Sequence, residues 1–204
     1  VSPKAWIREK DGFYLLKDGE TRDVKAELLA SRIAQCFAVD SIQYEPAVFD
    51  GKNVTKCKNY TSEERGIVSA EYVSIYCQNR DMDFLSFVLQ SDAYSYYMMN
   101  IVDYLVGNTD RHWGNWGFAV DNKTNGLQKL YPLMDFNKSF NTYDSVDGAR
   151  CLTTDKSVSQ KEAAVEAVRE VGLNLEREIE PELFENDEIR QMFYRRLEIL
   201  RAAI

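Results

Sequence analysis

The first forty residues alternate short apolar runs with polar turns and then change to helical spacing. The runs AWIRE and GFYLLK flank the tripeptide KDG at 10–12, and such a tripeptide between β-prone runs predicts an antiparallel ribbon over residues 5–17. After Thr21 the apolar residues recur near every third or fourth position, which predicts one amphipathic helix ending near Val39. We therefore expect a β-ribbon followed by a helix.

Residues 41–74 have a different texture, in which β-type runs are separated by polar turns. The runs read IQYEPAVFD, NVTKCKNY and GIVSAEYVSIY. Together with the opening ribbon they predict a small sheet with one inserted helix. The polar stretch 53–65 also carries three hydroxyl side chains that are candidates for autophosphorylation, namely Thr55, Thr61 and Ser62.

Helical patterns dominate the chain after residue 81. We predict a short helix over 84–89 and a longer one capped at Ser91 or Asp92, with Gly107 in the position of a C-terminal cap. Short strands are expected to follow this glycine. The sequence after residue 81 therefore predicts helices up to Gly107 and a pair of short strands after it.

The order of these elements predicts an α+β protein of two lobes. Amphipathic patterns at 159–171 and from about residue 181 to the end add further helices to the second half. We place a small β-rich lobe with one helix at 1–75 and a mainly helical lobe at 76–204, which together form one unit. A chain of 204 residues is long enough for two small lobes that share a core.

Composition narrows the classes of partner. With 25 Lys and Arg residues against 33 Asp and Glu residues, the net charge is −8, and a field of this sign repels polyanions, so nucleic acid is not expected as a partner. The four cysteines form no Cys-x-x-Cys pair and there is one histidine, which argues against a transition-metal cluster. No apolar run suits a membrane span or an export signal, and we expect a cytoplasmic protein without membrane contact.

The residues most suited to chemistry lie in GNTDRHWGNWGF at 107–118 and KLYPLMDFNKSF at 129–140. Phosphoryl transfer requires a group that orients the attacking hydroxyl, oxygen ligands for Mg²⁺ and a cation on the phosphates. Asp110 and Asn115 lie five residues apart in a turn after a helix, and Asp135 follows a short apolar strand. One or two protein ligands suffice for Mg²⁺, because phosphates and water complete its shell. These residues therefore form a candidate site for a nucleotide and Mg²⁺.

The same residues resemble the catalytic loop and metal motif of the HipA-like serine/threonine kinases. The pattern Asp-x-His-x-x-Asn at 110–115 is followed, twenty residues after its asparagine, by Asp135-Phe136. The resemblance extends over 1–140, where SPKAWI at 2–7 is similar to the end of the family's phosphate-binding loop and its first strand. It implies a bacterial, two-lobed protein-kinase-like fold that uses ATP and Mg²⁺.

The resemblance implies a role for each matching residue. Asp110 would orient or deprotonate the acceptor hydroxyl, while Asn115 and Asp135 would hold Mg²⁺. Lys17 would pair with the α and β phosphates of ATP, and Glu27 would hold Lys17 in place. By residue pattern alone, Lys17 is also compatible with an exposed lysine at the end of a ribbon, and Glu27 with the solvated face of its helix.

Further nucleotide contacts follow from the same resemblance. Lys4 is a second candidate for a phosphate contact, and the backbone of Glu71, Tyr72 and Val73, where the linker between the lobes would run, would hydrogen-bond adenine. His112 either ties the catalytic loop to backbone groups or acts directly at the phosphate, and the two readings stand side by side.

Two departures from the family pattern limit what is carried over. Asn137 stands where many protein kinases have glycine, so we infer nothing about movement of that loop. The family's full-length toxins carry an N-terminal subdomain that meets an antitoxin; this chain has no room for it, and we expect no antitoxin partner.

We predict an ATP- and Mg²⁺-dependent kinase that phosphorylates a Ser or Thr hydroxyl of a protein whose identity the sequence does not reveal. The first alternative is a pseudokinase that binds nucleotide or protein without turnover. The second is a lipid or small-molecule kinase, because the string DRHxxN also resembles the catalytic loop of phosphoinositide kinases.

Overall fold

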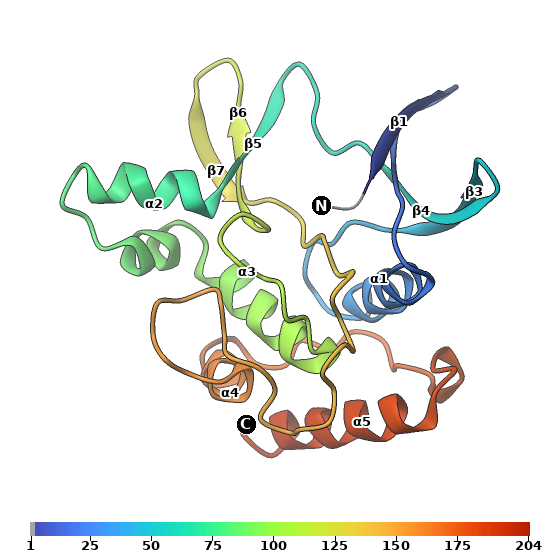
Figure 1. The fold of residues 1–204 in the computed structure, drawn as a ribbon. Helices are drawn as coiled ribbons and strands as arrows, with labels where there is room; N and C mark the ends of the chain where they lie inside the picture. The colour runs from blue at the N-terminus through green and yellow to red at the C-terminus, as the bar shows by residue number, and fades with distance from the viewer. Residues whose placement is uncertain (1–2) are drawn as a thin grey trace.

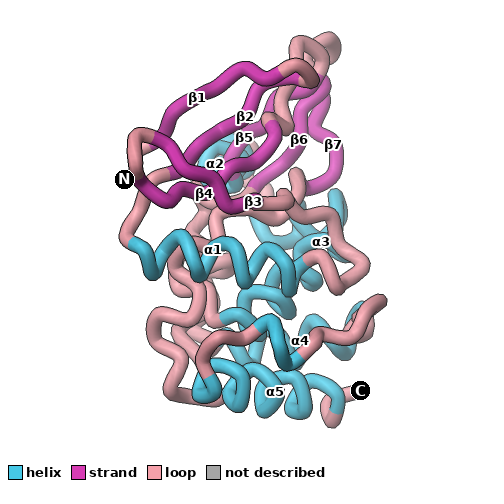
Figure 2. The backbone as a smooth tube through the Cα atoms, turned by 90° about the vertical axis from the view of Figure 1, so that its right-hand side faces the viewer, coloured by secondary structure: helices cyan, strands magenta, loops and turns pink. Residues whose placement is uncertain are grey.

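The computed structural model describes residues 3–204, so Val1 and Ser2, the latter part of the predicted phosphate-binding loop, lie outside the described residues. Strands gather at one end of the molecule and most of the helices lie toward the other (Figures 1 and 2). The first sheet has the strand order β1-β2-β4-β3 with antiparallel neighbours. Its strands are β1 (Lys4–Glu9), β2 (Gly12–Lys17), β3 (Glu45–Phe49) and β4 (Lys52–Lys58).

The opening ribbon is confirmed, and its register determines which side chains share a face. Lys4 lies opposite Lys17, and Lys17 lies opposite Thr55 on β4. Directly paired residues project to the same side of a sheet, so these three side chains share one face. This is the face from which Lys17 and Thr55 reach Glu27 of helix α1, which lies beneath the sheet in Figure 2.

Helix α1 (Thr21–Ala34) is the predicted helix, but it ends before Val39. The residues beyond it pair with the C-terminal part of the chain instead. Phe37 forms an isolated β-bridge with Leu175, and the N–H of Ala38 donates to the carbonyl of Asn174 at 2.9 Å. Tertiary pairing therefore removes these residues from the helix that their apolar spacing predicts.

A second sheet has the order β5-β6-β7, with β5 (Arg65–Ser69), β6 (Gly117–Asp121) and β7 (Gly126–Leu130). The prediction of β structure is wrong for the residues after Ser69, because helix α2 (Ala70–Gln78) begins immediately after β5. Three of its residues, Ala70, Val73 and Cys77, are buried along one face. Burial of that face outweighs the β propensity of the local sequence.

The chain passes from the first sheet to the second between residues 58 and 65. A lobe boundary at residue 75 would fall inside α2, whereas β5 already pairs with β6 of the second sheet. Gly117 permits this pairing at close range, since a Cβ at that position would lie 2.1 Å from the carbonyl oxygen of Val68. The passage between the two sheets lies before residue 75, and the lobe boundary near that residue stays a prediction.

Helix α3 (Phe84–Val106) contains the two helices that we predicted, joined across a kink at Asp92. The carboxylate of Asp92 accepts the N–H of Ser95 at 3.1 Å, as a cap for the second part. The helix ends at Gly107, which adopts a left-handed conformation with φ 61°. Glycine suits this position because other residue types rarely adopt a left-handed conformation.

The last helices are α4 (Gln160–Val171) and α5 (Asp187–Arg201), with a 3₁₀ turn η1 (Pro181–Leu183) between them. Ser159 and Glu162 form a capping box at the start of α4, which confirms the predicted helix. The predicted helix from residue 181 is replaced by η1 and α5. No helix among residues 3–204 is long and apolar enough to cross a membrane.

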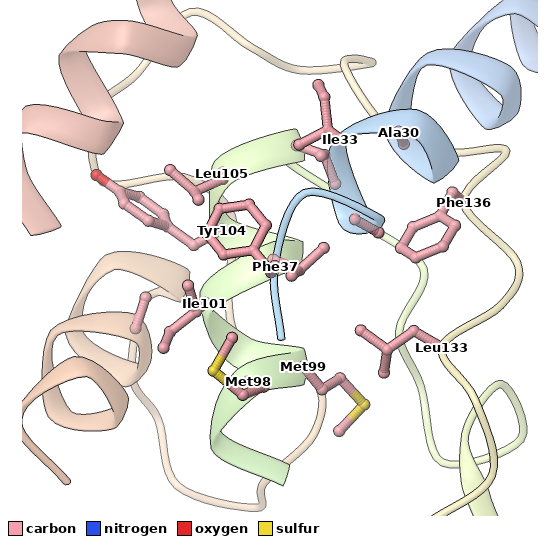
Figure 3. Packing of buried hydrophobic residues seen from close by; sticks show 14 of the residues in the cluster. Ala30, Ile33, Phe37, Met98, Met99, Ile101, Tyr104, Leu105, Leu133 and Phe136 are labelled. Carbon is pink, nitrogen blue, oxygen red and sulfur yellow. The ribbon is translucent and has the colours of Figure 1, made fainter. Parts of the chain in front are cut away.

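The hydrophobic core centres on the second half of α3, which packs against α1, α4, α5 and β7. Figure 3 shows residues from α1, α3 and the segment after β7 meeting there. They include Ala30, Ile33, Met98, Met99, Ile101, Leu105, Leu133 and Phe136. Because Phe136 is buried in this core, Asp135, the residue before it, is held at the edge of the sheets.

Candidate functional site

A buried lysine connects three distant parts of the chain. Lys17, the last residue of β2, is 6% exposed. Its Nζ lies 2.5 Å from Oε1 of Glu27 and 2.6 Å from Oδ1 of Asp135. Glu27 comes from α1 and is itself 2% exposed. We call Lys17, Glu27 and Asp135 the lysine cluster. Its geometry excludes the readings of an exposed lysine and a solvated glutamate.

Two residues to which the sequence assigned no place at the nucleotide site enclose this cluster. The hydroxyl of Thr55 donates to Oε2 of Glu27 at 2.6 Å, and Thr55 is 1% exposed. Burial and this hydrogen bond remove Thr55 from the candidates for autophosphorylation. The hydroxyl oxygen of Tyr44 accepts the N–H of Asp135 at 3.3 Å, and the ring of Tyr44 lies 5.4 Å from Nζ of Lys17. The cluster is therefore held on several sides.

The opposite charges of the lysine cluster stabilise one another in their ionised forms despite burial. Burial lowers the pKa of Lys17, but Glu27 and Asp135 outweigh this effect and raise it above its ordinary value. Burial raises the pKa of Asp135, yet Lys17, Arg111 and Lys4 together bring it below its ordinary value. Lys17 is therefore a cation and Asp135 an anion at neutral pH.

The predicted catalytic residues lie in the loop 108–116 between α3 and β6. The side-chain amide of Asn115 donates to the carbonyl of Asp110 at 2.8 Å and to its Oδ2 at 3.3 Å. Nδ1 of His112 accepts the N–H of Gly114 at 3.0 Å, and its Nε2 lies 3.9 Å from Oδ1 of Asp110. The side chains of Asp110 and His112 are 45% and 55% exposed. The structure thus brings all three together at the surface.

Arg111, which the sequence reading passed over, anchors this loop from inside. It is 2% exposed, and its Nε and Nη2 lie 2.8 Å and 3.1 Å from the two carboxylate oxygens of Asp103 on α3. Its Nη1 donates to the carbonyls of Asn115 and Met134. One guanidinium therefore joins the loop 108–116 to the residue before Asp135. A buried Asp-Arg pair eight residues apart gives no local signal in the sequence.

Asn108 makes a second connection between the two motifs. Its Nδ2 donates to the carbonyl of Asp135 at 3.3 Å, and its Oδ1 accepts the N–H of Asp110 at 3.2 Å. Asp135 has φ 63°, a left-handed conformation that aspartate tolerates better than most residues. Strained conformations of this kind persist where the surroundings determine them, often at functional sites.

The remaining predicted nucleotide contacts are more dispersed. Lys4 is exposed on β1, near enough for its charge to lower the pKa of Asp135. The stretch from Glu71 to Val73 is the first turn of α2 and not an extended linker. The N–H of Glu71 already donates to the carbonyl of Trp113 at 3.0 Å. Tyr72 is 67% exposed, whereas Val73 is buried in the core. A backbone contact with adenine here stays a prediction.

The oxygen atoms at the site fit a hard divalent cation. Asp135 is ionised, and only its Oδ1 receives the lysine, so Oδ2 accepts no hydrogen bond from residues 3–204. Asn115 uses its amide nitrogen toward Asp110, which leaves its amide oxygen. Among the described residues no three His, Cys, Asp or Glu side chains gather as a closed metal site. A carboxylate and an amide match Mg²⁺, which keeps water and phosphate ligands.

The solved structures similar to this chain include a kinase. The whole chain aligns with the Helicobacter pylori proinflammatory kinase CtkA, with a TM-score of 0.72 and 14% identity, and covers 88% of that chain. It also aligns over its whole length with HipA of Shewanella oneidensis MR-1, solved with HipB and operator DNA of their toxin–antitoxin system, with a TM-score of 0.54 and 12% identity. The chain spans 63% of that HipA chain.

The protein therefore has the HipA-like, two-lobed kinase fold that its motifs predict. At 14% and 12% identity this likeness establishes the fold. No family model and no curated protein matches the sequence. The chemistry assigned to this fold consequently rests on the residues of the site.

Proposed function

We propose that the protein is a kinase that uses ATP and Mg²⁺ and transfers the γ-phosphate to a serine or threonine hydroxyl of another protein. The observation that carries the proposal is the lysine cluster, held beside the loop 108–116 by Arg111 and Asn108. Phosphoryl transfer needs a phosphate-binding cation, metal ligands and a group at the acceptor. Side chains of each kind are present here.

Lys17 is the cation for the α and β phosphates. Glu27 holds its ammonium group from α1, and Thr55 in turn holds Glu27. Because these contacts do not involve Asp135, Lys17 keeps its position when Asp135 turns to a metal ion. Lys4, exposed on the paired strand, is the second candidate for a phosphate contact.

Asn115 and Asp135 are the residues that would hold Mg²⁺. The bound ion would neutralise charge on the β and γ phosphates. Asp135 is suited to this task because its carboxylate stays ionised despite burial. Arg111 donates to the carbonyls next to both ligands, so it limits how far the two can separate.

Asp110 is the group that meets the acceptor. Its carboxylate is 45% exposed and faces solvent beside His112, so a hydroxyl on a large partner can approach it. The acceptor oxygen forms a bond to the γ phosphorus as the bond to the bridging oxygen of ADP breaks. The proton of the hydroxyl passes to Asp110. His112 belongs to the same exposed surface, and its hydrogen bond to Gly114 helps to hold the loop.

The test follows phosphate transfer from γ-labelled ATP, with and without Mg²⁺, to a mixture of protein substrates and to the protein itself. Parallel samples carry Asp135→Asn, or Asp155→Asn as a matched control at an exposed carboxylate far from the motifs in sequence. We expect metal-dependent label on serine or threonine in the parent and in the control, and none with Asp135→Asn.

Two results would contradict the proposal in different ways. Binding of ATP without any transfer, in correctly folded protein, would indicate a pseudokinase. Transfer to a lipid or small hydroxyl compound, with none to protein, would keep the kinase chemistry and reject the protein acceptor. A thermal-shift titration with ATP on the same samples separates these outcomes from a failure to bind nucleotide.

A further inference from the structure

A cavity of about 760 Å³ lies away from the lysine cluster, between α1, the segment that follows the metal motif, and α5. Arg22 of α1 lines one part of it, and Met192 and Arg195 of α5 line another. The segment 140–144 completes the lining. None of the residues proposed for catalysis lines this cavity, so the proposed kinase chemistry does not explain it.

Three arginines surround the segment without an acidic partner. Arg22 donates from Nη2 to the carbonyl of Asn141 at 2.7 Å, and the exposed Arg195 lines the cavity. Arg196 is 0% exposed, and its guanidinium lies 4.2 Å from the ring centre of Tyr143. Its Nη atoms donate to backbone carbonyls, and its Nε has no hydrogen-bond partner among the described residues.

The acids nearby form no ion pair with these cations, although the charge of Asp144 acts on Arg196. Asp144 and Glu188 also line the cavity, yet neither forms an ion pair with an arginine, and Arg22, Arg195 and Arg196 form no ion pair with any acid among residues 3–204. The whole chain carries a net charge of −8. A local group of unpaired guanidinium groups in such a chain is a site for one or more anionic oxygens.

Thr142 carries the aliphatic hydroxyl among the residues that line this cavity. It is exposed, and it lines the same cavity as Arg22 and Arg195. Its neighbour Asn141 is bound by Arg22, and its neighbour Tyr143 lies under Arg196. We propose that Thr142 is a phosphorylation site and that the cavity receives its phosphate, with Arg22 and Arg195 as the direct ligands and Arg196 as the buried charge behind them.

A phosphate on Thr142 suits this cavity better than a free anion does. Phosphorylation adds about −1.5 to −2 charges and three strong acceptor oxygens, each able to receive charge-assisted bonds from a guanidinium group. A covalent tether keeps the phosphate at high effective concentration against the repulsion of an acidic chain. The bound phosphate would tie the segment after Asp135 to α1, which carries Glu27, and to α5.

The source of the phosphate rests on the proposed function. A second molecule of the protein transfers the γ-phosphate of ATP to Oγ1 of Thr142, so that the new P–O bond replaces the bond to ADP. The hydroxyl proton passes to Asp110 of the molecule that catalyses the transfer. Thr142 lies two residues beyond Phe140, whose carbonyl Arg22 also binds, so the modified residue needs no large movement to meet this arginine.

The first test measures the phosphate-binding site without requiring kinase activity. Protein with phosphothreonine incorporated at position 142 is compared with unmodified protein by thermal unfolding, each in the parent, Arg195→Gln and Arg22→Gln backgrounds. Phosphothreonine at Thr124, exposed in the turn between β6 and β7, is the matched control. We expect phosphorylation at 142 to raise the Tm by about 3 °C in the parent and by less than half as much in either arginine variant.

An equal Tm with and without phosphate at 142, or a rise that both arginine variants retain, would overturn the proposal. The second test maps the label after incubation with Mg²⁺ and ATP. Label on Thr142 supports the assignment, and label confined to other residues contradicts it. If no residue is labelled and no substrate is phosphorylated, the proposed kinase function fails, and the Tm comparison alone decides whether the cavity binds the phosphate.

Discussion

The lysine cluster and the loop 108–116 are two halves of one candidate site that differ in their relation to solvent. Lys17 and Glu27 are 6% and 2% exposed, whereas the side chains of Asp110 and His112 are 45% and 55% exposed. Buried charges keep fixed positions and act strongly through a low dielectric. An exposed carboxylate can instead exchange protons with an arriving hydroxyl. In the proposed function, this difference separates a nucleotide side from an acceptor side.

The two halves are also stabilised differently. The lysine cluster consists of direct ion pairs between side chains from two lobes, and its loss affects folding as well as chemistry. The exposed loop depends on Arg111, whose charge is balanced by Asp103 below it. Substitutions in the exposed half should therefore change turnover alone, and substitutions in the buried half should change stability.

The largest effect is expected at the exposed carboxylate. Asp110→Asn keeps an acceptor for the amide of Asn115 and should leave the fold unchanged, but it removes the group that would receive the proton in the proposed reaction. We expect turnover to fall by about 10³-fold or more, with a Tm within about 2 °C of the parent. Initial rates of phosphate transfer and thermal unfolding, beside Asp155→Asn, measure both. Turnover within tenfold of the parent would reject the assignment of Asp110.

The next effect is expected where the loop is anchored. Arg111→Met leaves Asp103, which is 4% exposed, without its cationic partner. Breaking a buried ion pair in this way costs about 3–5 kcal/mol in the free energy of unfolding. Urea unfolding followed by circular dichroism measures the loss. The double variant Arg111→Met with Asp103→Leu should recover part of it, and a single variant as stable as the parent would show that the pair does not anchor the loop.

A smaller effect on stability is expected inside the lysine cluster. Glu27→Gln keeps a hydrogen-bond acceptor for Thr55, and Asp135 still pairs with Lys17. We expect a loss of about 1–3 kcal/mol in the free energy of unfolding and weaker binding of ATP. Glu20→Gln, at the exposed residue before α1, is the control and should lie within about 0.5 kcal/mol of the parent. Equal behaviour of the two variants would contradict the role of Glu27.

The smallest expected effect is that of pH, near neutrality, on the free energy of unfolding. Lys17 and other cations lower the pKa of Asp135 in the folded state despite its burial, so its stabilisation is complete above the ordinary carboxyl value of about 4. It is lost as the pH falls through the lower folded value. The raised pKa of Lys17 gives stabilisation below the ordinary lysine value of about 10.4, lost as the pH rises above it.

The difference in unfolding free energy between the parent and Asp135→Asn should therefore be constant between about pH 5 and 9 and decrease in acid. Urea unfolding at intervals of pH measures it. A difference that changes steeply near neutral pH would show that another group, and not the lysine cluster, dominates the effect of this substitution.

The sequence was informative where chemistry is local. Asp110 and Asn115 share one turn, and Asp135 follows a strand that is recognisable from its apolar residues, so their spacing indicated a phosphoryl-transfer site before any coordinates. The cap at Asp92 was predicted for the same reason, because a helix cap involves residues three positions apart. Such contacts are encoded within a few residues of sequence.

Contacts between distant segments gave no comparable signal. Tyr44 and Thr55 enclose the lysine cluster, and Asp103 balances Arg111, but each is an ordinary residue in its local pattern. Helix α2 was misread as strand because its apolar residues fit both periods until burial of Val73 and Cys77 selected one. The same holds for Thr142, which only the cavity brings beside Arg22 and Arg195.

The sequence by itself determined the alternation of strands and helices, the order of the two motifs and the residue types that carry charge, because propensity, capping and spacing act over a few residues. Only the tertiary structure decided that Lys17 is buried between Glu27 and Asp135, while Asp110 stays exposed. Burial and pairing of charges depend on which distant segments pack together. That packing follows from the summed burial of apolar surface over the whole chain, which no single stretch of sequence contains.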